Sequence, residues 1–284
     1  MLSYQHEHAW HAGNFADVHK HLAQFALIER LMEKNSALSL IDTHAGRGHY
    51  PLAAPETARL GEYRDGVLPL WEARDRQTGL VARWCDALAT LQDDADTLSR
   101  YPGSPWWFAR TMRDNDRLTL YELHPGEHRH LEDATLETPH VRRLKRDGLG
   151  GLVHQLPVRT PRLCVLIDPS YEVKDEYETV ASTLAQVVRQ MRHAVVLIWY
   201  PLLGDGRHQR LLDGVKRHNI AKVWRSELTR HDPAGEHGLY GSGLLLLNPP
   251  WQLETQLDEA FGALAALYGD QAFHTSDWWM PERP

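Results

Sequence analysis

An apolar run that ends in an acid, a proline and an aromatic residue is the first place in this sequence where chemistry is expected. Residues 163–167 are Leu, Cys, Val, Leu and Ile, and Asp168, Pro169, Ser170 and Tyr171 follow them. The run predicts a buried strand, and open parallel sheets bind ligands outside the carboxyl ends of their strands. The loop suits a flat base with an exocyclic amine: Asp168 and the Pro169 carbonyl can accept both amine hydrogens, and Tyr171 offers a stacking face. These residue types are also ordinary turn formers, so the loop alone does not distinguish a base-binding site from a simple turn.

Two earlier apolar runs also end in residues that could hold a nucleotide. The run at 37–41 leads into residues 42–50, whose two glycines allow a ligand to approach the backbone closely. The run at 118–121 ends at Glu122, where doubly wound nucleotide-binding folds place an acid that holds two ribose hydroxyls. Each feature alone has an ordinary explanation, a glycine turn or an exposed acid at a strand end.

A further acid lies between these runs and the Asp168 loop. Asp147 and Gly148 are suited to accept a hydrogen bond from an adenine amine and to offer a backbone N–H, although an aspartate before a glycine can also simply cap a helix. A glycine loop, a ribose acid, an adenine acid and an amine-binding loop then follow one another on successive strands. This order is typical of S-adenosylmethionine-dependent amino methyltransferases.

The elements that must position these residues alternate between helix and strand. Apolar residues at helical spacing after Asn14 predict a helix to about residue 34. The fold class predicted is α/β, a Rossmann-like class I methyltransferase with a mostly parallel, doubly wound sheet. Residues 232–241 are too short for a crossover helix, so the last two strands should form a terminal antiparallel hairpin. The strands are predicted at 37–41, 118–121, 163–167, 194–199, 221–228 and 243–247.

The gap at residues 51–116 is longer than an α/β unit needs. We interpret it as a helical insertion subdomain, with residues 1–50 and 117–284 forming the Rossmann-like domain. The insertion could cap the crevice or pack beside it. Its apolar faces are expected to carry Trp71, Trp84, Leu88 and Leu91.

Composition limits the possible partners. The chain has 284 residues, is 42% hydrophobic and has a formal net charge of −7, which excludes an overall basic coat for nucleic acid. RNA contacts would need local patches such as residues 142–146 or 207–217, and we expect weak binding that favours protein-free RNA.

No apolar run approaches the roughly 18 to 20 residues of a membrane span, and the first residues are polar and rich in histidine, so we expect a cytoplasmic protein. Cys85 and Cys164 cannot form a disulfide framework.

Motifs along the whole chain make a resemblance specific. The sequence resembles the RlmJ family, adenine N6-methyltransferases of 23S ribosomal RNA. The motifs that carry it are Met1-Leu2-Ser3-Tyr4, His11-Ala12-Gly13-Asn14, Ala16-Asp17-Val18, Lys20-His21, Asp42-Thr43-His44-Ala45-Gly46, Gly61-Glu62-Tyr63, Tyr101-Pro102-Gly103-Ser104-Pro105, Glu122-Leu123-His124-Pro125 and Asn248-Pro249-Pro250-Trp251.

The resemblance implies methylation of one adenine of 23S ribosomal RNA, the base usually numbered 2030, with S-adenosylmethionine as cofactor. It makes Asp168 the proton acceptor and Tyr4 a residue that touches the RNA, and we expect Pro169 and Tyr171 to contact the base as well. The protein is expected to act as a monomer. The cofactor contacts that the resemblance implies are Lys20, His21, His44, Ser104, Glu122, Asp147, Gly148 and Asp168.

Two departures from the family pattern matter. Ser170 stands where the family has a second proline, which frees one φ angle and makes the loop less stiff. Extra residues between His6 and His11 leave the placement of His6 and His8 open, but not that of Tyr4 or His11.

A second proline loop and the histidines offer rival sites. Asn248-Pro249-Pro250-Trp251 resembles an amine-binding loop more closely than residues 168–171 do, but it should end an antiparallel strand and point away from the crevice. Five early histidines lack the spacing of metal ligands on a helix, and we expect no metal. They are His6, His8, His11, His19 and His21.

Two rival functions stay open. The first is a DNA adenine methyltransferase that uses residues 51–116 to recognise its target, because such a loop cannot distinguish RNA from DNA. The second is a non-catalytic factor in the use of external DNA, although a binding module has no need for Glu122, Asp147 and Asp168 in register.

Overall fold

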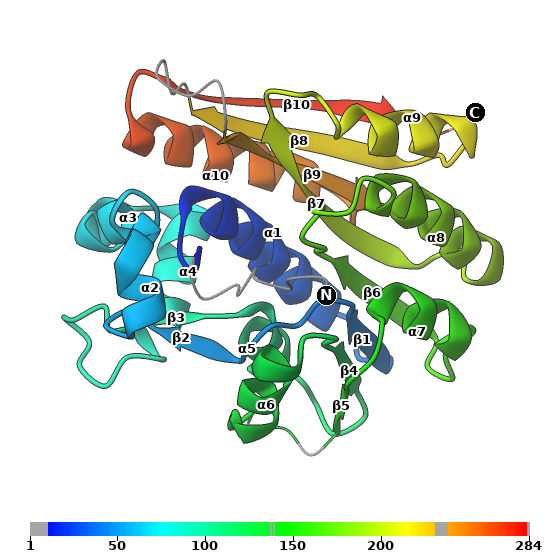
Figure 1. Ribbon diagram of the computed structural model, residues 1–284, viewed down its shortest axis with the longest axis horizontal. Coiled ribbons are helices and arrows are strands. Elements are labelled where there is room, and N and C mark those ends of the chain that lie inside the picture. Colours follow the sequence, from blue (N-terminus) through cyan, green and yellow to red (C-terminus); the bar gives the residue numbers. More distant parts are fainter. Residues whose placement is uncertain (1–10, 137, 139, 231–237, 283–284) are drawn as a thin grey trace.

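Eight strands form one sheet in the order β10-β8-β9-β7-β6-β1-β4-β5 in the computed structural model (Figure 1). The structure describes residues 11–136, 138, 140–230 and 238–282. The strands are β1 Leu38–Asp42, β4 Arg117–Tyr121, β5 Val141–Leu144, β6 Arg162–Ile167, β7 Val195–Leu203, β8 Val223–Arg230, β9 Leu239–Leu247 and β10 Ala272–Met280.

The sheet is parallel from β5 to β7 and antiparallel beyond it. β1 pairs in parallel with β4 and β6, and β6 pairs in parallel with β7. β9 is antiparallel to both β7 and β8, which confirms the predicted fold class and the terminal hairpin. Because β8 therefore runs in the same direction as β7, the carboxyl ends of β1, β4, β6, β7 and β8 face one edge of the sheet.

Two strands of this sheet were not predicted, and both lie at its edges. β5 falls in the basic segment at 142–146, and its residues are half-buried or exposed. β10 adds a third antiparallel strand beside β8, and several of its residues are exposed. Edge strands bury little of their surface, so neither carries the apolar run by which buried strands are found in a sequence.

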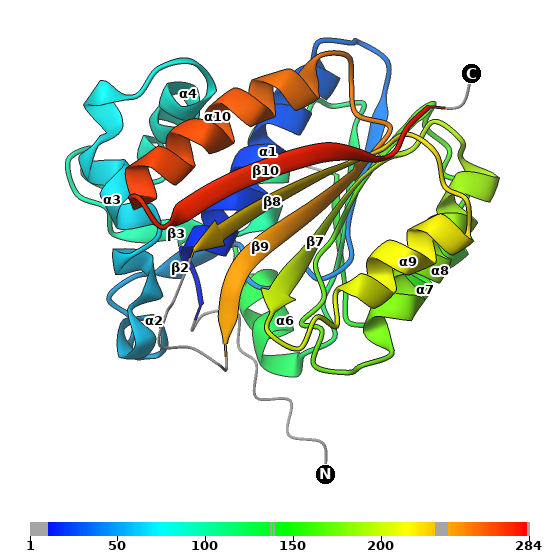
Figure 2. The ribbon, with the colours of Figure 1, turned by 90° about the horizontal axis from the view of Figure 1, so that it is seen from above.

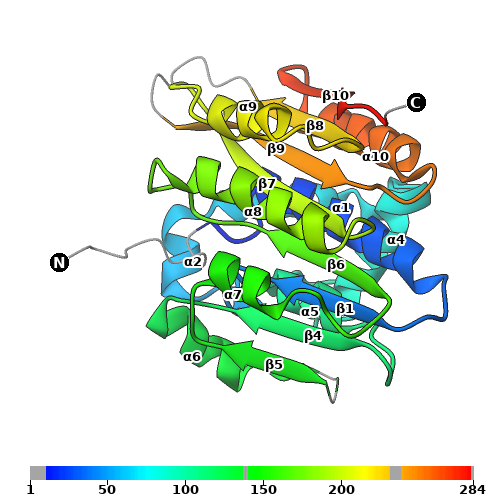
Figure 3. The same ribbon diagram turned by 90° about the vertical axis from the view of Figure 1, so that its right-hand side faces the viewer.

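Helices cover both faces of the sheet (Figures 2 and 3). One face packs on α1 together with α4 and α10, and the other packs on α7, α8 and α9. Asn14 caps α1 as predicted, since its side chain accepts from the Asp17 N–H. No helix in the described part of the chain is long and apolar enough to cross a membrane. The helices are α1 Phe15–Met32, α2 Pro55–Leu60, α3 Val67–Glu72, α4 Gly79–Ala89, α5 Ser104–Ala109, α6 Pro125–Asp133, α7 Gly148–Gln155, α8 Glu176–Gln190, α9 Gln209–Arg217 and α10 Leu253–Tyr268.

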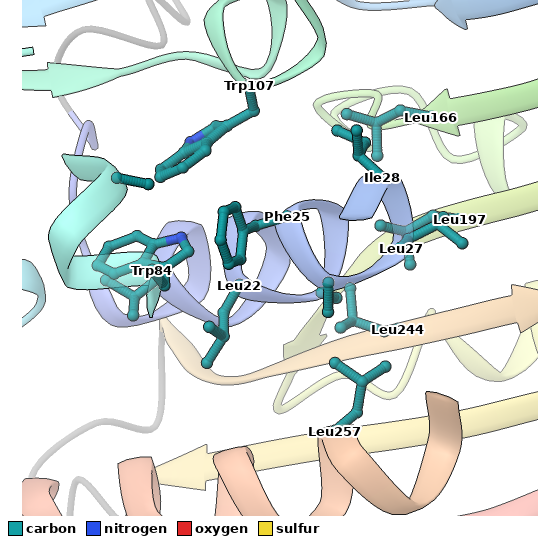
Figure 4. Close-up of a cluster of buried hydrophobic side chains, with 14 of the residues drawn as sticks. Leu22, Phe25, Leu27, Ile28, Trp84, Trp107, Leu166, Leu197, Leu244 and Leu257 are labelled. Carbon is teal, nitrogen blue, oxygen red and sulfur yellow. The ribbon is translucent and has the colours of Figure 1, made fainter. Parts of the chain in front are cut away.

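Residues 51–116 contain helices α2 to α5 and most of a short antiparallel pair, β2 His49–Pro51 with β3 Arg100–Pro102. The apolar side chains of this segment belong to the same hydrophobic cluster as α1. Trp84 stacks on Trp107 at a centroid distance of 5.4 Å, and both lie close to Phe25 of α1 (Figure 4). Trp71 and Leu88 are buried with them, whereas Leu91 is only half-buried. This shared packing fixes the start of α5 beside the carboxyl end of β1.

Candidate active site

A cavity of about 850 Å³ opens at the carboxyl ends of the parallel strands and beside the first turns of α1. Its size is near the upper end for small-molecule sites, which leaves room for more than one reactant. Predicted site residues from four separate stretches of the chain line it: Lys20, His21, His44, Ser104, Asp168, Pro169 and Tyr171.

Lys20 joins two carboxylates in this cavity, the buried Asp168 and the half-buried Asp17. Its Nζ donates to Asp168 Oδ2 at 2.6 Å and to Asp17 Oδ1 at 2.8 Å. Burial opposes the charge on Lys20, but the two carboxylates outweigh it and raise the Lys20 pKa, so the side chain stays protonated. Burial likewise opposes ionisation of Asp17, yet the charges of Lys20 and His21 lower the Asp17 pKa to about 2. The three side chains therefore form a fixed chain of alternating charge.

Asp42 is a site residue that sequence reasoning did not single out. Its Oδ2 accepts from Ser104 Oγ at 2.5 Å and its Oδ1 accepts from the His44 N–H at 3.1 Å. Burial, together with the nearby charge of Asp168, raises the pKa of Asp42 to about 7 in spite of these hydrogen bonds. An acid at the end of a mostly apolar run was the available signal, the same one that identified Asp168. Asp42 thus orients Ser104 and His44, two of the predicted cofactor contacts.

Glu122 supports the glycine loop at residues 42–50 from the side that faces away from the cavity. It is 6% exposed and does not line the cavity. Its Oε2 accepts from the Gly46 N–H at 2.9 Å and its Oε1 from the His124 N–H at 2.6 Å. Gly46 has a φ of 57°, a left-handed conformation that favours glycine, and it does line the cavity. Glu122 is therefore one hydrogen bond away from the cavity wall.

Asp147 caps α7 and lies outside the cavity lining. Its carboxylate accepts from the Leu149 N–H at 3.3 Å and from the Gly150 N–H at 2.8 Å. A side chain on Gly148 would come within 1.9 Å of the Thr43 carbonyl oxygen, so this glycine lets α7 pack directly on the loop after β1. The pair lies behind the wall formed by this loop, and its contact with adenine stays a prediction.

Tyr171 and Trp199 form an aromatic wall next to Asp168. Tyr171 has a φ of 55° and is 2% exposed, and its hydroxyl donates to the Trp199 carbonyl at 2.8 Å. Its ring stacks on Tyr177 at 4.3 Å, so Tyr177 occupies one of its faces. Trp199 lines the cavity, and its Nε1 donates to Ser242 Oγ at 3.0 Å. We did not predict Trp199 as a site residue, because it lies inside β7, whose apolar run continues to Leu203.

The histidines of the first helix have separate roles. His19 is buried between Ser242 and Ser226, with ring nitrogens at 2.9 and 3.0 Å from their hydroxyls. His21 lies 2.9 Å from the Tyr101 hydroxyl. Within the described ranges, no group of three or more His, Cys, Asp or Glu residues could hold a metal ion. Tyr4, His6 and His8 lie outside the described residues.

The second proline loop lies at the opposite edge of the sheet. Asn248 Nδ2 donates to the carbonyls of Arg192 and Ala194, just before the amino end of β7, at 3.1 and 2.8 Å. Trp251 is 79% exposed. None of residues 248–251 lines the cavity, so the orientation predicted from strand order is confirmed.

Comparisons with known proteins agree with this geometry. The chain is 33% identical to ribosomal RNA large subunit methyltransferase J of Haemophilus influenzae and of Escherichia coli, in each case over 99% of this chain and 100% of the relative. A crystal structure from Legionella pneumophila superposes with a TM-score of 0.88 at 30% identity, covering 94% of this chain and 98% of the other. The model of the family described as ribosomal RNA large subunit methyltransferase D, RlmJ, matches residues 35–280. The chain therefore belongs to the RlmJ family of ribosomal RNA large subunit methyltransferases.

Proposed function

We propose that this enzyme transfers the methyl group of S-adenosylmethionine to N6 of one adenine in 23S ribosomal RNA, the base usually numbered 2030. The observation that carries the proposal is the Asp168 loop, which faces the cavity at the carboxyl end of β6 with its carboxylate held by Lys20. The RlmJ relatives, named as ribosomal RNA large subunit methyltransferases, support the substrate class.

The chemistry of the cavity fits this cofactor. S-adenosylmethionine, when bound, supplies a sulfonium methyl group that is ready for transfer. Its positive charges match a cavity that carries the carboxylates of Asp17, Glu62 and Asp168. The backbone of Gly46 lines the cavity and is held by Glu122, and the absence of a side chain there allows close approach of a nucleoside.

Asp168 and Pro169 would then hold the adenine amine. The N6 lone pair is conjugated with the ring and is a poor nucleophile, so the site must aim the amine and take up its proton. Asp168 Oδ2 accepts from Lys20, and the Asp168 carboxylate would accept one amine hydrogen while the Pro169 carbonyl accepts the other. Asp168 takes the proton as positive charge develops on N6. Positioning of this kind can lower a barrier by about 7 to 11 kcal/mol.

We further propose that the substrate is protein-free RNA and that a monomer acts on it in the cytoplasm. An adenine must leave its stack to reach a cavity of this depth, which costs least in a loosely paired RNA element. The formal net charge of −7 supports weak, local contact with RNA over contact with a large folded particle. No metal takes part in this scheme.

Transfer of labelled methyl groups tests the proposal. Naked 23S RNA, assembled large subunits and duplex DNA are incubated side by side with the enzyme and labelled S-adenosylmethionine, and the labelled base is identified after digestion. We expect N6-methyladenine in naked RNA. Label in duplex DNA alone would favour the DNA methyltransferase, and no transfer to any substrate would favour a non-catalytic role.

A further inference from the structure

An arginine on a different element from the lysine lines the cavity as well. Arg230 is the last residue of β8, and it lines the cavity together with Phe15 and Leu239. Its Nη1 donates to the Asp65 carbonyl at 2.9 Å. Its guanidinium carbon lies 5.6 Å from the ring centroid of Phe15 and 5.2 Å from that of Tyr268. A backbone bond and two aromatic rings thus hold this guanidinium in place.

Arg230 differs from the other cations that line the cavity in its interaction partners. Lys20 bridges two carboxylates, and Arg207, which also lines the cavity, pairs with Asp205. Among the residues that the structure describes, Arg230 has no ion pair with a carboxylate. A guanidinium carries five N–H donors, and the bond to Asp65 uses one of them. Arg230 is therefore a preorganised, half-buried cation in the cavity wall that retains donors for an anion.

We propose that Arg230 binds a phosphate of the RNA strand beside the target adenosine. The inference rests on the proposed function: when the base lies against the Asp168 loop, the sugar–phosphate chain that carries it must pass over the mouth of the cavity. Arginine suits phosphate because its planar fork can make two parallel hydrogen bonds. A chain with a net charge of −7 has no general basic coat, so a fixed arginine has to place the strand. Phosphate contacts of this type fix the position of the RNA strand but do not recognise its base sequence.

A matched arginine elsewhere provides the control. Arg110 also lies over two aromatic rings, 5.7 Å from Phe25 and 5.4 Å from Trp106, but it does not line this cavity. The test compares Arg230→Gln, Arg230→Lys and Arg110→Gln in binding to a fluorescent RNA fragment of 23S sequence around the methylated adenine, over a range of salt concentrations. Arg230→Gln should bind about 10-fold more weakly and lower the slope of log affinity against log salt by about 0.7 to 0.9. Arg230→Lys should keep the slope, and Arg110→Gln should match the parent.

Replacing single phosphates of the RNA with a neutral analogue shows which phosphate Arg230 contacts. Methylphosphonate groups are placed one at a time at the phosphates flanking the target adenosine. One position should weaken binding by the parent yet cause no further loss in Arg230→Gln, because both changes remove the same contact. Additive losses at every position would overturn the proposal.

A purely structural role and a failed function give different results. If Arg230 only ties β8 to Asp65, Arg230→Gln should lower the melting temperature more than Arg110→Gln and leave the salt slope unchanged, which overturns the phosphate contact. Binding of S-adenosylhomocysteine, followed by calorimetry, should be the same in all variants. If the parent transfers no methyl group to the fragment, the proposed function fails, while the salt slopes still decide whether Arg230 contacts RNA phosphate.

Discussion

Two similar loops end two strands of the same sheet, and their surroundings are opposite. Residues 168–171 end β6 and face the cavity, with Asp168 buried against Lys20. Residues 248–251 end β9, which runs the other way, so Asn248 contacts the backbone just before the amino end of β7 and Trp251 lies in solvent. In sequence, the second loop has the more familiar pattern of an amine-binding loop. The difference teaches that strand direction, and not the motif, decides which loop can meet a substrate.

The largest effect should separate the two loops directly. Asp168→Ala should lower the single-turnover rate of methyl transfer about 100-fold to 10,000-fold, because a positioned proton acceptor is lost. Asn248→Ala should stay within a few-fold of the parent, since its side chain bonds backbone at the far edge. Saturating cofactor in both assays isolates the chemical step. The reverse result would move the site to residues 248–251.

The second prediction concerns charge, which only the Asp168 loop has. Lys20→Met leaves the buried Asp168 and the half-buried Asp17 without their cation, and we expect the free energy of unfolding to fall by about 3 to 5 kcal/mol. Urea denaturation at neutral pH measures it. Adding Asp17→Asn to the same chain should restore part of the loss. A loss below about 1 kcal/mol would mean that water already compensates the two carboxylates.

Glu122 tests whether the cavity beside the Asp168 loop binds the cofactor as proposed. Removing a charged hydrogen-bond partner costs about 1.5 to 3 kcal/mol, so Glu122→Ala should bind S-adenosylhomocysteine 10-fold to 100-fold more weakly. Titration calorimetry gives the affinity, with Asn248→Ala as the control at the other edge. Unchanged affinity in Glu122→Ala would show that Glu122 contributes to cofactor binding neither by a ribose contact nor by its hydrogen bond to Gly46.

The last prediction is a pH dependence of stability that comes from Asp42. The pKa of Asp42 is raised from 3.8 to about 7, so between about pH 4 and pH 7 the folded protein holds a proton that the unfolded chain has lost. This contribution to stability is therefore present at low pH and is lost as pH rises to about 7. For one proton the slope is at most about 1.4 kcal/mol per pH unit.

Urea denaturation at pH values across this window checks the slope. Asp42→Asn carries no titrating group, so it should gain stability relative to the parent as pH rises. Asp168→Asn removes a nearby negative charge and should shift the window to lower pH. Parallel stability curves for the parent and Asp42→Asn would show that Asp42 titrates normally.

The sequence by itself determined the central part of the sheet and part of the cavity lining. Long apolar runs can only be buried, and an acid directly after such a run lies at a strand end, so β1, β4 and β6 with Glu122 and Asp168 could be predicted. The same reasoning should have identified Asp42, which ends β1 in the same way, but not Trp199, which lies inside β7. Family motifs added Lys20 and Ser104, for which no local pattern indicates a role.

Tertiary structure alone decided which of these residues meet. Lys20 and Asp168 are 148 positions apart, and their contact depends on α1 packing across the carboxyl ends of the parallel strands. The edge strands β5 and β10 could not be found by their apolar pattern, because their burial is one-sided or slight. Arg230 lines the cavity because β8 runs in the same direction as β7, a direction set by pairing across β9. Strand pairing is a long-range choice, and local residue patterns do not contain it.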